Sequence, residues 1–171
     1  MKRWFALYVQ SRKEKVVERE LLKDGYEVYL PIKKELRQWK DRKKVVEMPL
    51  ISSYIFTYIE ENDMWDIVRK SGCIKFIWFN GKPCPIPDNQ IESIKLLLAK
   101  DIDIEFDNQI QLTKGNKVRI VEGAFAGLVG IIKHKEGKSN FAVRIDALAI
   151  DLTITLDKSN LHLVEAISEE N

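Results

Sequence analysis

Seven basic side chains surround a single tryptophan in the segment 33–44. Trp39 is flanked by Lys33, Lys34, Arg37, Lys40, Arg42, Lys43 and Lys44. Lysine and arginine pair with phosphates, and tryptophan stacks on nucleotide bases, so this combination is typical of a nucleic-acid contact. Basic runs of this kind also occur on solvated hairpins that bind no ligand. The residue types alone leave both interpretations open.

Aromatic residues alternate in the apolar segment 54–59, where Tyr54, Phe56 and Tyr58 occupy every second position. A β-strand has a side-chain period of two, so these rings are expected on one face of a sheet. A tyrosine hydroxyl needs a polar partner, which suits a partly exposed contact surface better than a dry core.

The chain shows no arrangement of residues typical of catalysis or metal binding. No carboxylate stands beside a histidine or a nucleophile in a recognisable order, and Gly123–Gly127 lacks the lysine of a phosphate-binding loop. Cys73 and Cys84 form no CxxC pair, and their spacing from the histidines does not predict a zinc site. We therefore expect no enzyme activity, no catalytic residue, no metal and no cofactor.

Size and composition predict a soluble protein of one or two domains. The chain has 171 residues, of which 45% are hydrophobic and 32% charged. No apolar run reaches the roughly 18–20 residues that span a bilayer, and Gln10 to Lys13 interrupts the apolar start too early for a signal peptide. We expect a cytoplasmic, monomeric protein with no membrane partner. The net charge is only +2, yet residues 1–50 hold 14 basic against 8 acidic residues.

The first hundred residues predict an α+β domain with an antiparallel sheet. A capping box, Ser11 with Glu14, is expected to begin the first helix, and Gly25 to end it. Strands are expected over 4–9, 26–30, 54–59 and 73–79, a basic hairpin over 32–48 with its turn at 40–42, and helices over about 62–69 and 88–100.

The remainder of the chain predicts a small all-β domain. Five short apolar runs, at 117–121, 128–133, 141–147, 150–156 and 160–164, suggest a closed barrel. The acidic segment 101–113 is interpreted as a tether, although Ile102, Ile104 and Phe106 could instead dock as a strand. The predicted domains are thus 1–100 and 114–167, joined by a linker at 101–113.

A glycine-rich turn lies between two of these runs. Gly123, Gly127 and Gly130 follow the alternating residues 117–121, and such spacing favours a sharply folded strand–turn–strand. The spacing resembles the KOW motif, a small barrel module of transcription and ribosome-associated proteins. The positions that carry this likeness are Gly123, Ala124, Phe125, Gly127 and Gly130.

With both halves placed, nearly the whole chain resembles the NusG family of transcription factors. Residues 4–9 through 85–88 look like the N-terminal, NGN-type domain of that family, and the glycine-rich segment looks like its SH3-like KOW barrel. Three segments, 26–44, 49–56 and 76–83, are closer to the specialised UpxY type, whose relatives include RfaH and LoaP. Ser52 and Ser53, for example, stand within a segment that replaces the Phe-Pro-Gly-Tyr pattern of the housekeeping protein.

The resemblance implies a transcription antitermination and elongation factor for one long operon. It would bind the clamp helices of the largest subunit of elongating RNA polymerase and suppress pausing and termination. The positions that match the polymerase-binding cavity are Tyr8, Tyr54, Phe56 and Phe79. We expect their rings to be accessible to a partner helix. The alternatives are a housekeeping NusG-type factor and a KOW-domain protein that binds ribosomes or RNA.

The resemblance also implies nucleic-acid contacts. Residues at the first and second helices would touch non-template DNA, and the matching positions are Gln10, Arg12, Lys13, Arg19, Arg69 and Lys70. The basic hairpin, with Arg37, Trp39, Lys40, Arg42, Lys43 and Lys44, could meet upstream DNA or nascent RNA. In the family a barrel loop recruits a ribosomal protein or Rho. Here the loop 146–151 has leucine where the aromatic residue would stand, so contact with either partner stays open.

Overall fold

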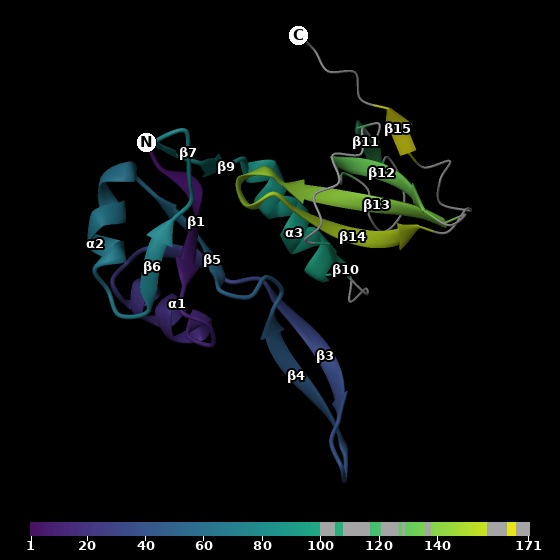
Figure 1. Cartoon of the computed structure of the whole chain (residues 1–171), viewed down its shortest axis with the longest axis horizontal. Helices are drawn as coiled ribbons and strands as arrows, with labels where there is room; N and C mark the ends of the chain where they lie inside the picture. The colour runs from purple at the N-terminus through teal and green to yellow at the C-terminus, as the bar shows by residue number, and fades with distance from the viewer. Residues whose placement is uncertain are drawn as a thin grey trace. The chain divides into compact units, whose positions relative to one another are not determined.

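The chain divides into two packed units, Met1–Asp88 and Asn89–Asn171 (Figure 1). The structure is a computed structural model that describes residues 1–99, 105–107, 117–120, 127, 129–135, 138–156 and 164–166. Within these ranges no helix is both long and apolar enough to cross a bilayer.

The first unit is built on an antiparallel sheet with β1 (Arg3–Val9) at its centre. The strand order is β2 (Glu27–Tyr29), β5 (Tyr54–Ile59), β1 and β6 (Cys73–Phe76). A short strand, β9 (Pro85–Ile86), also pairs with β1, opposite Trp4 and Phe5. The apolar and aromatic sequence of β1 fits this central position, because five of its seven residues are buried.

One face of this sheet packs on helices α1 (Glu14–Lys23) and α2 (Met64–Val68). Alternate residues of β1, Phe5, Leu7 and Val9, are buried in one cluster with residues of both helices: Val17, Leu21, Met64 and Ile67. Full burial of such a side chain contributes about 1.5–3 kcal/mol, so this cluster is the main stabilising feature of the unit. The predicted α+β fold of the first part is confirmed.

The start of α1 differs from the sequence-based prediction. The helix begins at Glu14, Lys13 is its N-cap, and no side chain caps it. The predicted Ser11–Glu14 capping box is therefore wrong. Arg12 adopts a left-handed backbone conformation (φ 65°), which separates Ser11 from the first helical turn. The Glu14 carboxylate instead accepts a hydrogen bond from the backbone N–H of Ser53, at 2.9 Å.

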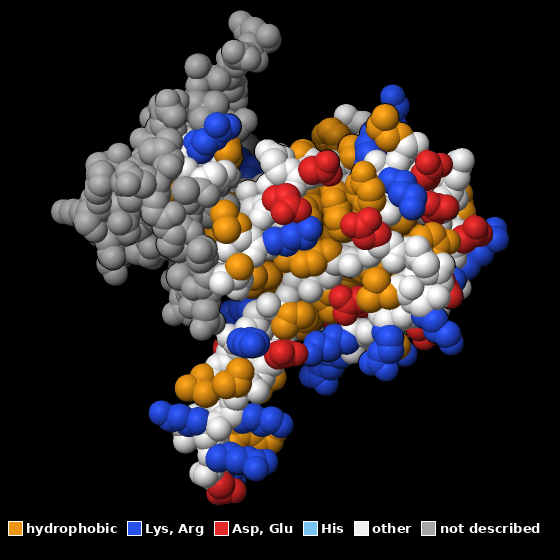
Figure 2. Space-filling view, turned by 180° about the vertical axis from the view of Figure 1, so that it is seen from behind, with side chains coloured by type: hydrophobic (Ala, Val, Ile, Leu, Met, Phe, Trp, Pro, Cys, Tyr) orange, Lys and Arg blue, Asp and Glu red, His pale blue; other side chains and the backbone are white. Residues whose placement is uncertain are grey.

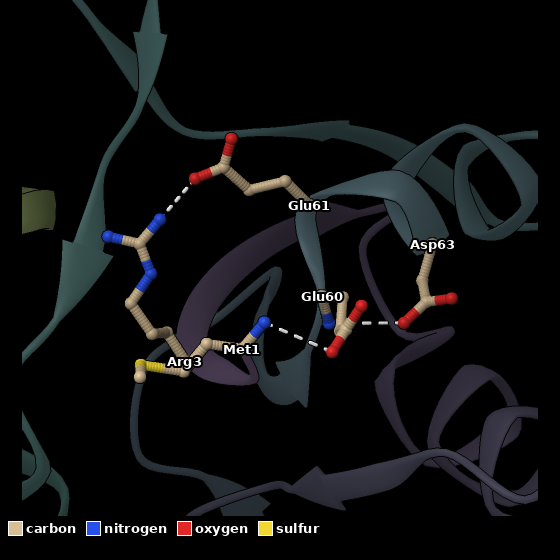
Figure 3. Close-up of polar contacts among 5 residues, drawn as sticks. All are labelled: Met1, Arg3, Glu60, Glu61 and Asp63. Carbon is tan, nitrogen blue, oxygen red and sulfur yellow. Dashed lines mark hydrogen bonds and ion pairs between the residues drawn. The ribbon is translucent and has the colours of Figure 1, made fainter.

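Ionic contacts tie the start of β1 to the 3-10 helix η1 (Glu61–Asp63), as Figure 3 shows. The N-terminal amine lies 3.1 Å from Glu60 Oε1, and the Arg3 guanidinium pairs with Glu61. The Glu60 N–H donates to Asp63 Oδ2 at 3.0 Å and thereby closes the turn. Exposed pairs of this type contribute about 1 kcal/mol or less each, so they fix the local geometry more than the fold.

Two hairpins leave the main sheet of the first unit. The predicted basic hairpin is confirmed as β3 (Ile32–Gln38) and β4 (Lys43–Pro49), and Figure 1 shows it projecting away from β5. The predicted strand 73–79 is divided into β6 and β7 (Trp78–Phe79), and β7 pairs with β8 (Lys82–Pro83). The two strands are separated at Ile77, whose N–H still donates to the Ala6 carbonyl. Beyond Ala6, toward the start of β1, the pairing partner is β9.

The second unit contains α3 (Asp88–Ala99) and a six-stranded antiparallel sheet. The strands are β10 (Glu105–Asp107), β11 (Lys117–Ile120), β12 (Val129–Lys135), β13 (Lys138–Ile145), β14 (Ile150–Leu156) and β15 (Val164–Ala166), in the order β10-β14-β13-β12-β11-β15. A 3-10 helix, η2 (Asp146–Leu148), joins β13 to β14. The predicted all-β second part is confirmed.

The segment before β11 and the glycine-rich turn lie only partly within the described residues. Glu105–Asp107, within the segment 101–113 that is expected to be a tether, pairs with β14. This pairing agrees with the alternative in which the segment docks as a strand. The exact domain boundaries and the closure of the sheet into a barrel stay predictions. Of the glycine-rich turn, Gly123, Ala124 and Phe125 lie outside the described residues, whereas Gly127 and Gly130 lie within them.

Gly130 is required by close packing of two strands. A Cβ at this position would lie 2.4 Å from the Ala142 carbonyl oxygen and 2.7 Å from the Phe141 ring. Real Cβ atoms do not approach backbone oxygens so closely, so any side chain would push β12 away from β13. The glycine therefore allows the buried Phe141 ring to cross under β12.

We predict that Gly130→Ala destabilises the second unit by about 2–3 kcal/mol or more, because overpacking displaces paired backbone. Urea unfolding followed by circular dichroism measures the change. Gly25→Ala is the matched control: Gly25 has φ 87° and open space around its Cβ position, so that change costs only about 1 kcal/mol of backbone strain. Equal losses in the two variants would contradict this explanation of Gly130.

Candidate functional site

The face of the main sheet opposite the helix-packed core carries six aromatic residues. They are Trp4 and Tyr8 of β1, Tyr29 of β2, and Tyr54, Phe56 and Tyr58 of β5, and we call this surface the aromatic face. The strand register pairs Trp4 with Tyr58, Tyr8 with Tyr54 and Tyr29 with Phe56. The expectation that Tyr54, Phe56 and Tyr58 share a face is confirmed by this register.

Only part of the aromatic face is accessible. Trp4, Ala6 and Phe56 are buried, with 0% of Phe56 exposed. Tyr8 and Tyr54, at one end of the face, are half-buried, as are Tyr29 and Tyr58. The expectation that Phe56 presents its ring to a partner is therefore not met in this structure. Phe56 stacks against Tyr29 at 6.3 Å between ring centroids and supports the surface from within.

Tyr8 and Tyr54 form a tilted ring pair at the accessible end. Their centroids are 5.2 Å apart and their planes meet at 50°. Partial burial, together with the neighbouring Tyr8, raises the pKa of Tyr54 above its ordinary value. Its hydroxyl therefore stays protonated at neutral pH and can donate a hydrogen bond. The pair offers two apolar rings and a polar rim, which is the composition of a protein contact.

Phe79 lies on a separate element, the β7–β8 hairpin, and is 70% exposed. Asn80 (φ 50°) and Gly81 (φ 74°) form the turn, so Phe79 stands beside a tight two-residue loop. The hairpin arises between β6 and β9, which are both neighbours of β1. Phe79 is thus accessible as expected, but it does not belong to the aromatic face.

A buried carboxylate fixes the loop that precedes Tyr54. Glu14 is buried, and it bonds to the N–H of Ser53 across 39 positions of sequence. Ser53 has a left-handed backbone (φ 65°), which is unfavourable for a residue with a side chain. Glu14 thus holds a strained turn next to the Tyr8–Tyr54 pair. The local sequence gives no signal for this contact.

Two of the residues expected to contact DNA, Gln10 and Lys13, lie next to Gly72. The Gln10 N–H bonds to the Gly72 carbonyl, and a Cβ at Gly72 would lie 3.6 Å from Lys13 Cβ. Arg12, Lys13 and Arg69 are exposed. Arg19 is exposed on α1.

Lys70 is already engaged in an ion pair. Its Nζ lies 2.6 Å from Asp24 Oδ2, and this hydrogen bond raises the pKa of Lys70. Arg69 makes a looser pair with Asp66, at 3.8 Å. Any phosphate contact of these residues would therefore rest on Arg12, Lys13 and Arg69 more than on Lys70.

The candidate residues of the β3–β4 hairpin are all exposed, and Figure 2 shows basic side chains gathered along this projection. Arg37 pairs with Glu35 at 3.3 Å. Lys40, Arg42, Lys43 and Lys44 make no ion pair with any residue that the structure describes. The hairpin therefore carries positive charge that the described chain does not neutralise.

Metal and thiol chemistry find no support in the described ranges. No group of three or more histidine, cysteine, aspartate or glutamate side chains there could hold a metal ion. Cys73 is half-buried against the core of the first unit, and burial raises the pKa of its thiol to about 11. The thiol therefore stays protonated at neutral pH, and Cys73 packs as a small apolar side chain.

Comparison with known protein families gives two matches along the chain. The family described as "Transcription termination factor nusG" matches residues 2–95, and the KOW motif matches residues 114–145. The "Transcription termination/antitermination protein NusG" of Lactococcus lactis is 26% identical over 179 aligned residues, which cover 95% of this chain and 94% of that protein. The protein of the same name from Campylobacter jejuni is 26% identical and covers 77% of this chain.

One solved structure, described as "Domain interaction in Thermotoga maritima NusG", has a similar fold. It superposes with a TM-score of 0.52 at 20% sequence identity and covers 98% of each chain. This likeness supports the architecture of a sheet-and-helix unit followed by a KOW unit.

We predict opposite changes in stability when the Glu14–Ser53 hydrogen bond is removed and when the backbone strain at Ser53 is relieved. Glu14→Ala should lower stability by about 1–3 kcal/mol, because it leaves the Ser53 N–H without its partner. Ser53→Gly should raise stability by about 1 kcal/mol, because glycine adopts the left-handed conformation without strain. Urea unfolding measures both, with Glu20→Ala, an exposed change on the same helix, as control. A less stable Ser53→Gly protein would refute the strain argument.

Proposed function

Because this chain belongs to the NusG family of transcription termination and antitermination factors, we propose that it binds elongating RNA polymerase through Tyr8 and Tyr54. The observation that carries the proposal is the half-exposed Tyr8–Tyr54 ring pair at one end of the aromatic face, beyond the buried Trp4, Ala6 and Phe56. Half-exposed tyrosines on a rigid sheet are good anchors for a partner helix, since few rotamers are lost on binding. The proposed partner is the clamp helices of the largest subunit.

Phe79 is proposed as a second anchor. It is exposed on a tight hairpin whose base is held by two neighbours of β1. Phe56 takes a supporting role, because its ring is buried against Tyr29 and cannot be reached directly. Truncation of Phe56 would therefore test stability rather than binding, since removing a buried phenylalanine ring costs about 3–5 kcal/mol.

The proposed mechanism needs no bond chemistry. A factor that binds one polymerase conformation better than another shifts the population toward that conformation. A differential affinity of about 1.4 kcal/mol changes the ratio of states tenfold, which is enough to shorten a pause markedly. Bridging the clamp to the other side of the cleft would favour its closed form.

We further propose that the protein is a specialised antiterminator of the UpxY type that acts on one long operon. The segments 26–44, 49–56 and 76–83 support this, because they resemble the UpxY type, and 49–56 replaces the Phe-Pro-Gly-Tyr pattern of the housekeeping protein. Ser53 supports it physically, since it holds the left-handed position that a glycine would occupy without strain. Arg12, Lys13 and Arg69 are the proposed contacts to non-template DNA.

A housekeeping NusG-type role is the second candidate, favoured by the names of the relatives in two bacteria.

We predict that Tyr8→Ala combined with Tyr54→Ala abolishes binding to a purified polymerase elongation complex and leaves the fold intact. Both rings are half-exposed, so truncation removes interface contacts while the helix-packed core remains. Tyr8→Phe with Tyr54→Phe is the matched control, because it keeps the rings and should retain most of the affinity. Co-sedimentation with the complex measures binding, and circular dichroism monitors folding. Unchanged binding of the alanine variant would exclude this surface as the contact.

A further inference from the structure

The β3–β4 hairpin has two chemically different faces. Directly opposed residues of an antiparallel pair share a face. One face carries the apolar pairs Leu36–Val45 and Ile32–Pro49 together with the polar pairs Lys34–Glu47 and Gln38–Lys43. Arg37 lies opposite Lys44 on the other face, where Lys33 is also found. We call Lys33, Arg37 and Lys44 the basic face of the hairpin.

The charge of the hairpin is strongly unbalanced. Residues 32–49 contain seven basic and three acidic side chains. Two of the acids are engaged, Glu35 with Arg37 and Glu47 with Lys15 of α1, at 3.3 and 3.4 Å. The remaining cations lie on both strands and in the loop. Mutual repulsion of these cations is unfavourable for the free hairpin, and a polyanion would relieve it.

Trp39 stands at the tip of this charged element. Its side chain is 61% exposed, and none of the described ring contacts involves it. The Trp39 N–H donates to the Arg42 carbonyl at 2.9 Å, so the backbone that carries the indole is fixed in a closed loop. A large exposed aromatic side chain on a fixed loop is a stacking surface, and basic side chains surround it.

We propose that the β3–β4 hairpin binds an unpaired stretch of nucleic acid, with one base stacked on Trp39 and phosphates along the basic face. An unpaired strand fits better than a duplex, because stacking on an indole requires a base whose face is free. Phosphates follow Lys33, Arg37 and Lys44, since Arg37 and Lys44 are the one directly opposed pair of cations in the hairpin, whereas Lys34 on the other face lies opposite Glu47. This contact uses none of the residues of the aromatic face and stands whether or not the polymerase contact does.

The test is fluorescence anisotropy of labelled RNA and DNA single strands of about 12 nucleotides, and of the matching duplex, with the full chain and no polymerase. Trp39→Ala should weaken single-strand binding about fivefold or more, and Trp39→Phe less. Arg37→Ala with Lys44→Ala should lower the slope of log affinity against log salt by about 1.4. Glu35→Gln should strengthen binding, because it frees Arg37 from its carboxylate partner.

Matched controls separate the hairpin from general effects. Trp78→Ala removes another exposed indole, and Lys2→Ala with Lys23→Ala removes the same charge elsewhere, so both should bind as the parent protein does. Trp39→Phe and Glu35→Gln keep the strand pairing, and thus exclude simple misfolding of the hairpin. A preference for RNA or DNA would identify the strand that is bound. Equal affinity for the duplex, or equal behaviour of Trp39→Ala and Trp78→Ala, would overturn the proposal.

Discussion

The central position of β1 in its sheet is the constraint on which the rest of the first unit depends. β5 pairs along one edge of β1, and β6 and β9 share the other. Because side chains alternate, Phe5, Leu7 and Val9 must face the helices while Trp4, Ala6 and Tyr8 face the opposite side. The seven residues of β1 therefore contribute both to the core and, through Tyr8, to the candidate polymerase contact. A shift of one position in register would exchange them.

The parts proposed for recognition are exposed, but their bases are fixed to this sheet. The Leu50 N–H bonds to the Pro31 carbonyl at the base of the β3–β4 hairpin, and the Cys84 N–H bonds to the Ile77 carbonyl at the base of the β7–β8 hairpin. Glu14 plays the same role for the turn before Tyr54. Exposed aromatic side chains are thus held by backbone bonds to a rigid support, which limits the conformational entropy lost on binding.

Close packing of two strands in the second unit depends on a glycine. Gly130 lets Phe141 lie against β12, so this position of the KOW segment reflects a steric need rather than a binding role. Gly127, with φ 93°, donates its N–H to the Ile120 carbonyl and closes the turn between β11 and β12. Glycines of one motif can therefore serve two different purposes, backbone conformation at one position and interstrand space at the other.

The sequence by itself determined the elements whose signals are local. The strand 54–59, the basic hairpin, the helices after Gln10 and at Asp88, and the β-rich second part all follow from periodicity and turn residues close in the chain. The tertiary structure alone decided which residues are buried and which are bonded. Glu14 caps a turn 39 positions away instead of its own helix, the strand 73–79 divides where β9 takes its place, and Phe56 is buried whereas Phe79 is exposed. Periodicity assigns a side chain to a face, but only packing between distant segments determines whether that face is covered.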